Sequence, residues 1–227
     1  MGTNSGKGDK EKITHPYLLL CEGRDEKEFL IAYLNNYLIP SNPKFDDIQI
    51  VDFKGINQLT KKLRALEATE NFDIVKGIAV IRDAETDSTG AQQSIASSLG
   101  ACGISSDLFS SNPYYLFPYK DIDGNWRNGT LEDLCVDIVA DNIDNEVPAR
   151  DLLPCCNDFL ETIKNVRGSE FPRKHKNLLH TYFSATNKFV DLKTGEAAKA
   201  GAFNWRHQKL NDLKEFLLVL AEMGRSQ

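Results

Sequence analysis

The sequence lacks any hydrophobic run long enough to cross a membrane. A membrane-spanning helix needs about 20 consecutive apolar residues, and no apolar stretch in the 227 residues approaches that length. Residues 1–16 also lack the apolar segment of a secretory signal, and they predict a disordered tail. We therefore expect a cytoplasmic protein with no membrane partner.

The chain also lacks the residue spacings of a zinc site. Its five cysteines are an odd number, and none has the spacing of a C-x-x-C or C-x-x-H motif. We expect them to be small buried residues in a reducing compartment. The four histidines show no paired metal spacing. The pattern gives no reason to expect zinc.

An excess of positive charge is missing as well. The chain has 27 lysines and arginines against 33 aspartates and glutamates, a net charge of −6 at pH 7. This balance argues against a protein that coats nucleic acid, although an acidic site that recruits divalent cations would itself contribute to the total. At this length the chain can bury a real core within one domain.

Short apolar runs alternate with helical patterns over the first half of the chain. Residues 17–21, 48–53, 77–81 and 113–118 predict buried strands, and residues 25–38, 57–67 and 92–99 predict helices between them. We place the end of the first helix at Pro40 and Pro43. Strand and helix alternation at this spacing predicts right-handed crossovers and a mainly parallel sheet. We therefore expect an α/β core over residues 17–120.

The second half of the chain predicts helices instead of strands. After a polar loop, Thr130 is a candidate N-cap, with Asp133 three residues later. Helical spacing then appears over residues 152–163, about 178–184, and 210–223. We expect residues 121–227 to form a helical C-terminal extension that completes the same domain.

Carboxylates follow two of the predicted strands. Glu22 comes directly after the first strand, and Asp83, Glu85 and Asp87 come after the third. If the extended backbone persists, these three acids project to one side. Acids from two strand ends can converge in the crevice beyond a parallel sheet, where hard oxygen ligands favour Mg²⁺ or Mn²⁺. The alternative is an acidic solvated loop, above all for Asp87. Gly23 would let the backbone turn directly after Glu22.

Glu22-Gly23 and Asp83-x-Glu85 resemble the motifs of the TOPRIM domain, which topoisomerases, bacterial primases and nucleases of the OLD type share. The resemblance covers about residues 17–118. A looser likeness to small stand-alone TOPRIM proteins continues through residues 129–134. The chain departs from the family pattern at Glu85, where aspartate is usual. The resemblance implies a Rossmann-like fold with a Mg²⁺ site.

The resemblance also implies two further site residues. Glu132 corresponds to a late acidic element of the stand-alone relatives, although an acid in the first turn of a helix is also favoured by the helix dipole alone. Relatives of the OLD type use a lysine to balance charge in the transition state. Lys176 is our candidate for that lysine, with Lys174, Arg173 and His180 as alternatives.

These motifs predict Mg²⁺-dependent hydrolysis of phosphodiester bonds in DNA or RNA. Asp83 and Glu85, with Asp87 and Glu132 as further candidates, would hold the metal, for which Mn²⁺ could substitute. Glu22 would bind a second ion or act as general base on the attacking water. The alternative is a non-catalytic module that binds a Mg²⁺-nucleotide or a protein partner. Assembly into a homo-oligomer stays open.

Overall fold

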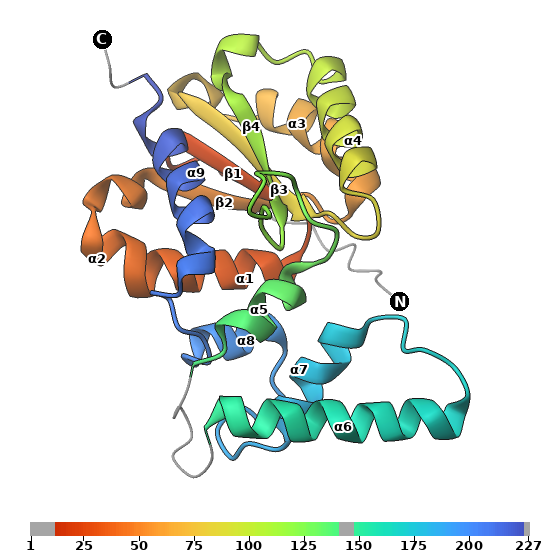
Figure 1. The fold of residues 1–227 in the computed structure, drawn as a ribbon. Coiled ribbons are helices and arrows are strands. Elements are labelled where there is room, and N and C mark those ends of the chain that lie inside the picture. The colour runs from red at the N-terminus through yellow and green to blue at the C-terminus, as the bar shows by residue number, and fades with distance from the viewer. Residues whose placement is uncertain (1–11, 141–147, 225–227) are drawn as a thin grey trace, which may run out of the picture.

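The strands form one parallel sheet in the order β2-β1-β3-β4. The computed structural model describes residues 12–140 and 148–224. Within them the strands are β1 (Tyr17–Cys21), β2 (Ile48–Asp52), β3 (Gly77–Asp83) and β4 (Phe109–Phe117). Each neighbouring pair is parallel, which confirms the expected α/β fold (Figure 1).

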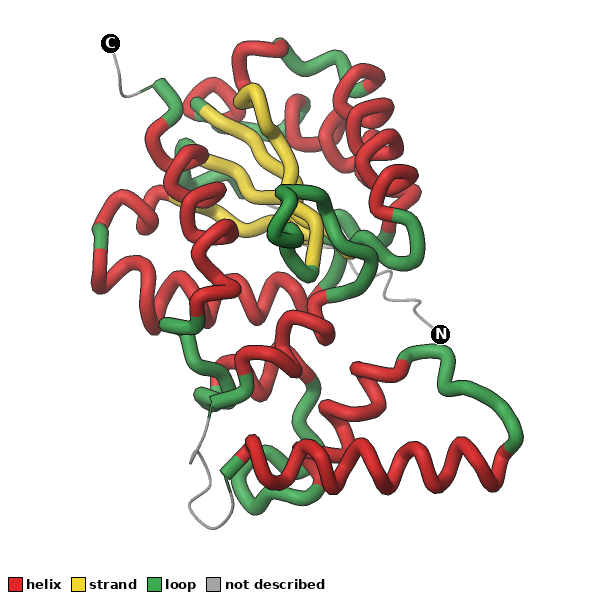
Figure 2. Tube along the Cα trace, viewed as in Figure 1, coloured by secondary structure: helices red, strands yellow, loops and turns green. Residues whose placement is uncertain are grey.

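Helices flank this sheet and make up most of the C-terminal half (Figure 2). They are α1 (Arg24–Tyr33), α2 (Ile39–Ser41), α3 (Leu59–Glu67), α4 (Ser88–Ala101), α5 (Leu131–Ile138), α6 (Ala149–Arg167), α7 (Lys174–Ser184), α8 (Thr194–Lys199) and α9 (Asn211–Glu222). None of the helices in residues 12–140 and 148–224 combines the length and apolar character needed to cross a bilayer.

The first helical segment is longer than the sequence predicts. A π-helical turn, Leu34–Leu38, joins α1 to α2, so the helical segment runs on to Ser41. Pro40 does not end the helix as expected. It lies inside this continuous helical segment, two residues after the π-helical turn, and the helix ends at Ser41.

The two faces of the sheet bury separate sets of side chains. Tyr17, Leu19 and Cys21 of β1 pack in the core that α1 and α9 cover, whereas Leu18 and Leu20 pack in the core that α3 and α4 cover. All five residues of β1 are buried. This is why the strand reads as a continuous apolar run instead of an alternating one.

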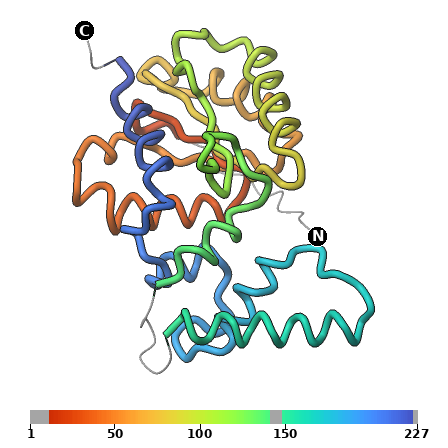
Figure 3. The backbone as a smooth tube through the Cα atoms, viewed as in Figure 1, coloured from red at the N-terminus to blue at the C-terminus, as the bar shows by residue number. Residues whose placement is uncertain are grey.

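The C-terminal half leaves the sheet and then returns to it. Helix α7 packs against α5 and α6, and α8 packs along α1. The last helix, α9, then lies beside the N-terminal segments (Figure 3), with Leu213 and Leu217 in the same core as Phe29 of α1. The sequence did not predict α8, whose residues TGEAAK carry no apolar stripe.

Residues 12–16 belong to the fold, which corrects the expected boundary of the tail. Ile13 is fully buried against the core under α3. The side chain of Gln49 in β2 accepts a hydrogen bond from Thr14 N and donates one to Lys12 O, each at 2.8 Å. One apolar residue and one amide therefore anchor this segment. The rest of the expected tail, residues 1–11, lies outside the described residues.

Candidate functional site

The carboxyl ends of β1 and β3 lie side by side at the centre of the sheet. The chain passes from β1 to β2 on one side and then crosses to β3 on the other. Ligands of open α/β sheets bind at such a switch point, beyond the carboxyl ends of the strands. Cys21 pairs with Ile81, so Glu22 leaves β1 beside Arg82, and Asp83 ends β3 one residue later.

A cavity of about 480 Å³ opens at this switch point. Its walls come from the β1–α1 and β3–α4 connections and from the starts of α5 and α7. Seven carboxylates and several cationic side chains line it: Glu22, Asp25, Glu26, Asp83, Glu85, Glu132 and Asp133, with Arg24, Arg173, Lys174, His175 and Lys176. We call it the carboxylate cavity. Five of the six predicted site residues line it, and Asp87 does not.

Asp83 is held at the end of β3 by the start of α5. Its Oδ1 accepts a hydrogen bond from Leu131 N at 2.8 Å. Burial raises the pKa of the Asp83 carboxyl well above its usual range, and the nearby charges of Glu26 and Glu132 raise it further. The negative charge of Asp83 is therefore unfavourable here without a cation.

One carboxylate oxygen of Glu22 has no hydrogen-bond donor among the described residues. This oxygen, Oε2, is buried, and the Nε of the buried Arg82 lies 3.9 Å from it. Burial raises the pKa of Glu22, and Arg82 only partly offsets that rise. A buried acceptor without a donor is unusual in folded proteins, and a bound ion or water is one arrangement that would satisfy it.

Gly23 does not have the role expected from the sequence. Its φ of −149° is extended backbone that any residue adopts. A Cβ at this position would instead lie 2.9 Å from Glu26 Oε2. The glycine therefore leaves room for the Glu26 carboxylate inside the cavity.

Glu26 is a site residue that the sequence argument missed. It lies one helical turn after Glu22, on the first turn of α1. Burial, together with the charges of Glu22, Glu132 and Asp25, raises the pKa of Glu26 to about 7. The signal that could have identified it was its place in the first turn of the helix that directly follows β1, beyond the carboxyl end of that strand.

The acids after β3 do not project to one side as expected. The strand ends at Asp83, and Glu85 adopts a left-handed φ of 55°. Its backbone exchanges hydrogen bonds of 2.8 and 2.7 Å with Gly129, which fixes this loop beside the start of α5. Asp87 is instead the N-cap of α4, where its Oδ1 accepts a hydrogen bond from Gly90 N at 2.9 Å. Asp87 therefore caps a helix, a local role that differs from both the metal ligand and the solvated loop considered from the sequence.

Glu132 and Lys176 form an ion pair inside the cavity. Lys176 Nζ lies 3.1 Å from Glu132 Oε1, and the glutamate side chain is only 10% exposed. The hydroxyl of Thr130 donates to the other oxygen, Oε2, at 3.0 Å. The two residues are 44 positions apart in the sequence, and the packing of α7 on α5 brings them together.

Asp133 and His175 form a second pair at the cavity wall. Asp133 Oδ2 accepts from Thr130 N at 2.8 Å, which completes the expected cap of α5, and Oδ1 bonds to His175 Nδ1. This bond raises the pKa of His175. Burial alone would raise the pKa of Asp133, but the bonds from His175 and Thr130 bring it below its ordinary value. Sequence spacing gave no signal for this pair.

The alternatives to Lys176 are placed less favourably. Lys174 lines the cavity, but its Nζ pairs with Glu161 on α6 at 3.1 Å. Arg173 also lines the cavity, at the N-cap of α7, but within the described residues it forms no ion pair with the buried carboxylates. His180 does not line it.

The donors of the carboxylate cavity suit a hard divalent cation, although their present arrangement is not that of a formed metal site. In the described ranges, no three Asp, Glu, His or Cys side chains are grouped closely enough to hold an ion. Carboxylate oxygens are nevertheless the ligands that Mg²⁺ and Mn²⁺ prefer. The unpartnered oxygen of Glu22 and the raised pKa values of Glu22, Glu26 and Asp83 fit a site that lacks compensating positive charge.

Comparison with known protein families identifies one match. A family model described as a protein of unknown function, DUF3226, matches residues 16–222. The chain belongs to this family. No curated protein and no solved structure matches the chain.

The match to DUF3226 extends over both halves of the fold. It includes the four strands of the sheet and the helices from α1 to α9. The segments that line the carboxylate cavity therefore lie in the part of the chain that the family model describes. They include the strand ends that carry Glu22 and Asp83, and α7, which carries Lys176.

Proposed function

We propose that this protein is a nuclease that hydrolyses phosphodiester bonds with Mg²⁺ at the carboxylate cavity. The observation that carries the proposal is the convergence of Glu22, Asp83, Glu85, Glu132 and Lys176, from four separate segments, on one cavity at the sheet's switch point. The likeness of Glu22-Gly23 and Asp83-x-Glu85 to TOPRIM motifs supports the same reaction. The substrate is DNA or RNA.

Asp83, Glu85 and Glu132 would hold the metal, with Glu22 and Glu26 beside them. A bound Mg²⁺ would supply positive charge to the phosphate oxygens and lower the pKa of water. Burial raises the pKa of Asp83, and repulsion from the neighbouring carboxylates of Glu26 and Glu132 raises it further. Binding of a divalent cation would remove that repulsion and favour their closer approach.

Glu22 and Lys176 suit the two remaining roles, which are the general base and the cation that stabilises negative charge on the phosphate. Glu22 carries a buried oxygen that has no donor among the described residues, and burial raises the pKa of Glu22, which makes it a better proton acceptor, as a general base requires. Lys176 lines the same cavity from α7, paired with Glu132 at 3.1 Å. Once Glu132 binds the metal, the ammonium group would be available to the negative charge that develops on the phosphate.

A cleavage assay with a matched pair of variants tests the proposal. Labelled single-stranded, duplex and supercoiled substrates are incubated with Mg²⁺, Mn²⁺ or chelator. We expect metal-dependent cleavage by the wild type and by Asp87→Asn, because asparagine also caps helices well. We expect none by Asp83→Asn. The absence of cleavage by the wild type with either metal, or equal activity in the two variants, would refute the proposal.

A second candidate function is a non-catalytic module that binds a Mg²⁺-nucleotide or a protein partner. The ion pair between Lys176 and Glu132 favours it, because the ammonium neutralises one of the carboxylates that would hold a metal. Under this alternative the same assay gives no cleavage with any substrate, while nucleotide or partner binding persists.

We also propose that the protein is located in the cytoplasm. It either forms a homo-oligomer or binds a protein partner, and both forms of assembly stay open. All five cysteines are free thiols, and four of them are buried. Free cysteines persist in reducing compartments. Fractionation of the cell and light scattering of the purified protein test these two points.

A further inference from the structure

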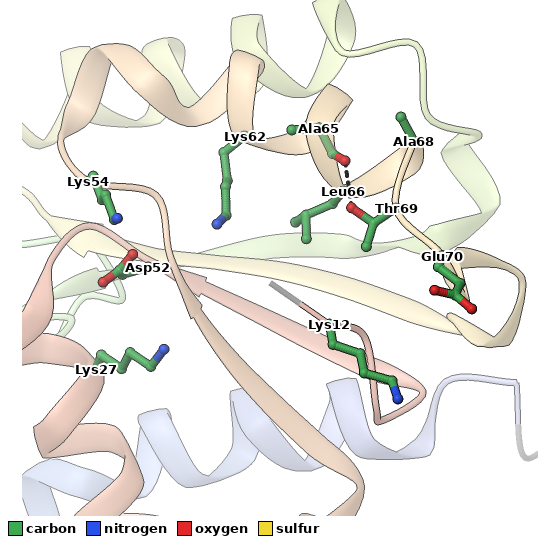
Figure 4. A pocket seen from close by; sticks show the side chains of 10 residues that line it. All are labelled: Lys12, Lys27, Asp52, Lys54, Lys62, Ala65, Leu66, Ala68, Thr69 and Glu70. Carbon is green, nitrogen blue, oxygen red and sulfur yellow. Dashed lines mark hydrogen bonds between the residues drawn. The ribbon is translucent and has the colours of Figure 1, made fainter. Parts of the chain in front are cut away.

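A second hollow lies along the open edge of the sheet. It measures about 870 Å³ and runs beside β2, between α1 and α3 (Figure 4). Four lysines and two acids are among its lining residues: Lys12, Lys27, Lys54, Lys62, Asp52 and Glu70. We call this hollow the lysine groove.

The lysine groove is basic although the protein is acidic. The whole chain carries a net charge of −6, yet lysines outnumber acids in the groove. In the described residues, no ion pair joins the ammonium groups of Lys12, Lys27 or Lys54 to a carboxylate. A local excess of positive charge that is not neutralised within the fold attracts anions.

The lysines are spaced along the groove. Figure 4 places Lys27 and Lys54 at one end, Lys12 at the other, and Lys62 between them on α3. The neighbouring strand β2 has five residues, which corresponds to roughly 16 Å of extended chain. This row of cations therefore suits a chain of phosphates better than a single small anion.

One end of the lysine groove adjoins the carboxylate cavity. Gly55, next to Lys54, donates its N–H to Glu22 O at 3.0 Å, and Lys27 N donates to Gly23 O at 3.1 Å. Glu22 and Gly23 line the carboxylate cavity. Lys54 has a left-handed φ of 60°, which is uncommon outside glycine and occurs often at functional sites.

We propose that the lysine groove binds the phosphate backbone of a nucleic-acid strand and leads that strand to the carboxylate cavity. This inference rests on the proposed nuclease function and extends it to the path of the substrate. None of the ten lining residues is aromatic, so the groove offers no platform on which bases stack. Contacts to phosphates alone carry no sequence information. Binding in the groove is therefore independent of sequence.

Binding measured without cleavage tests this inference separately from the nuclease proposal. Fluorescence anisotropy of labelled oligothymidylate is recorded in chelator, over a series of salt concentrations, with the full chain. The groove variant is Lys27→Gln/Lys54→Asn, in which asparagine tolerates the left-handed backbone. The control is Lys61→Gln/Lys76→Gln, which removes the same charge from exposed lysines that do not line the groove.

We expect the groove variant to lose affinity and the control to bind like the wild type. Each phosphate contact contributes about 0.7 to the slope of log K against log salt for single strands. Removing two contacts should reduce the slope by about 1.4, which corresponds to a roughly 25-fold loss of affinity near 0.1 M salt. Melting curves that match the wild type show that both variants fold.

Three results would overturn the inference. They are equal binding by the groove and control variants, no binding of oligothymidylate by the wild type at low salt, and displacement by ATP or inorganic triphosphate at the oligonucleotide's own concentration. The last result would identify a site for small anions. If the wild type binds oligothymidylate through the lysine groove but cleaves no substrate with Mg²⁺ or Mn²⁺, the nuclease proposal is refuted. The lysine groove would then still be a site that binds the phosphate backbone.

Discussion

Asp83→Asn is the substitution with the clearest expected effect, because it separates charge from shape. The asparagine Oδ1 can still accept the hydrogen bond that Leu131 N gives to Asp83 at 2.8 Å. Only the negative charge is lost. That charge is unfavourable in the metal-free protein, since burial and the neighbouring Glu26 and Glu132 raise the pKa of Asp83.

The magnitude follows from linkage between protonation and folding. One unit of raised pKa corresponds to about 1.4 kcal/mol, so we expect the variant to be more stable than the wild type in chelator by at least about 1 kcal/mol. For a chain of this size the melting temperature should rise by roughly 2–4 °C for each kcal/mol. A raised pKa penalises the folded state as pH rises. The gain should therefore be small near about pH 4 and grow toward neutral pH.

Thermal melting in chelator and in excess Mg²⁺ measures both halves of the prediction. Mass action should stabilise the wild type by about 2.7 kcal/mol when Mg²⁺ is present at roughly 100 times its Kd. The variant should lose this response. An Asp83→Asn protein that melts lower than the wild type in chelator, yet responds to Mg²⁺ as fully, would refute the reasoning. Asp87→Asn is the control and should behave like the wild type.

Three further predictions concern activity, packing and pH. Glu22→Gln should fold normally and slow cleavage by about 10²–10⁴-fold, the usual effect of a proton-transfer group, in a single-turnover assay; full activity would remove Glu22 from the mechanism. Gly195→Ala should destabilise the protein by about 1–3 kcal/mol in urea unfolding, because its Cβ would lie 2.7 Å from Glu28 Cβ where α8 packs on α1; an unchanged midpoint would contradict this packing. His175→Gln should destabilise the protein more at about pH 5.5 than at about pH 9. The raised pKa of His175 stabilises the folded state fully at pH values below about 6.5, the ordinary pKa of histidine, and this stabilisation is lost as the pH rises through the raised pKa of His175 in the folded protein. The lowered pKa of Asp133 confines the same effect to pH values above about 4. Equal destabilisation at the two pH values would show that the pair is not ionic.

The sequence was sufficient to predict the parallel sheet and the proximity of Glu22 and Asp83 at the carboxyl ends of its strands. The apolar run of β1 is buried on both faces, and such runs identify parallel strands without knowledge of their partners. Glu22 follows β1 and Asp83 ends β3, these two strands are neighbours, and the carboxyl ends of parallel strands share one edge of the sheet. The cap of α5 by Thr130 and Asp133 was likewise predictable, because capping residues act on their own local backbone.

Features that depend on packing between distant segments were not predictable in the same way. The pairing of Asp133 with His175 requires α7 to pack on α5, and no periodicity in the sequence encodes that contact. Arg82 is 4% exposed in an otherwise apolar strand, and a charged residue there was a signal that went unused. The placement of Asp87 beside Asp83 was expected only if the strand continued, and β3 ends at Asp83.

An anomalous difference map from a crystal soaked in Mn²⁺ tests the central claim most directly. The claim is that the carboxylate cavity is a divalent metal site formed by Asp83 together with Glu22, Glu85 or Glu132. It predicts a manganese peak inside that cavity, coordinated by Asp83 and at least one of the other three, and no such peak in crystals of Asp83→Asn. An empty cavity at saturating Mn²⁺, or a peak that persists in the variant, would contradict the claim.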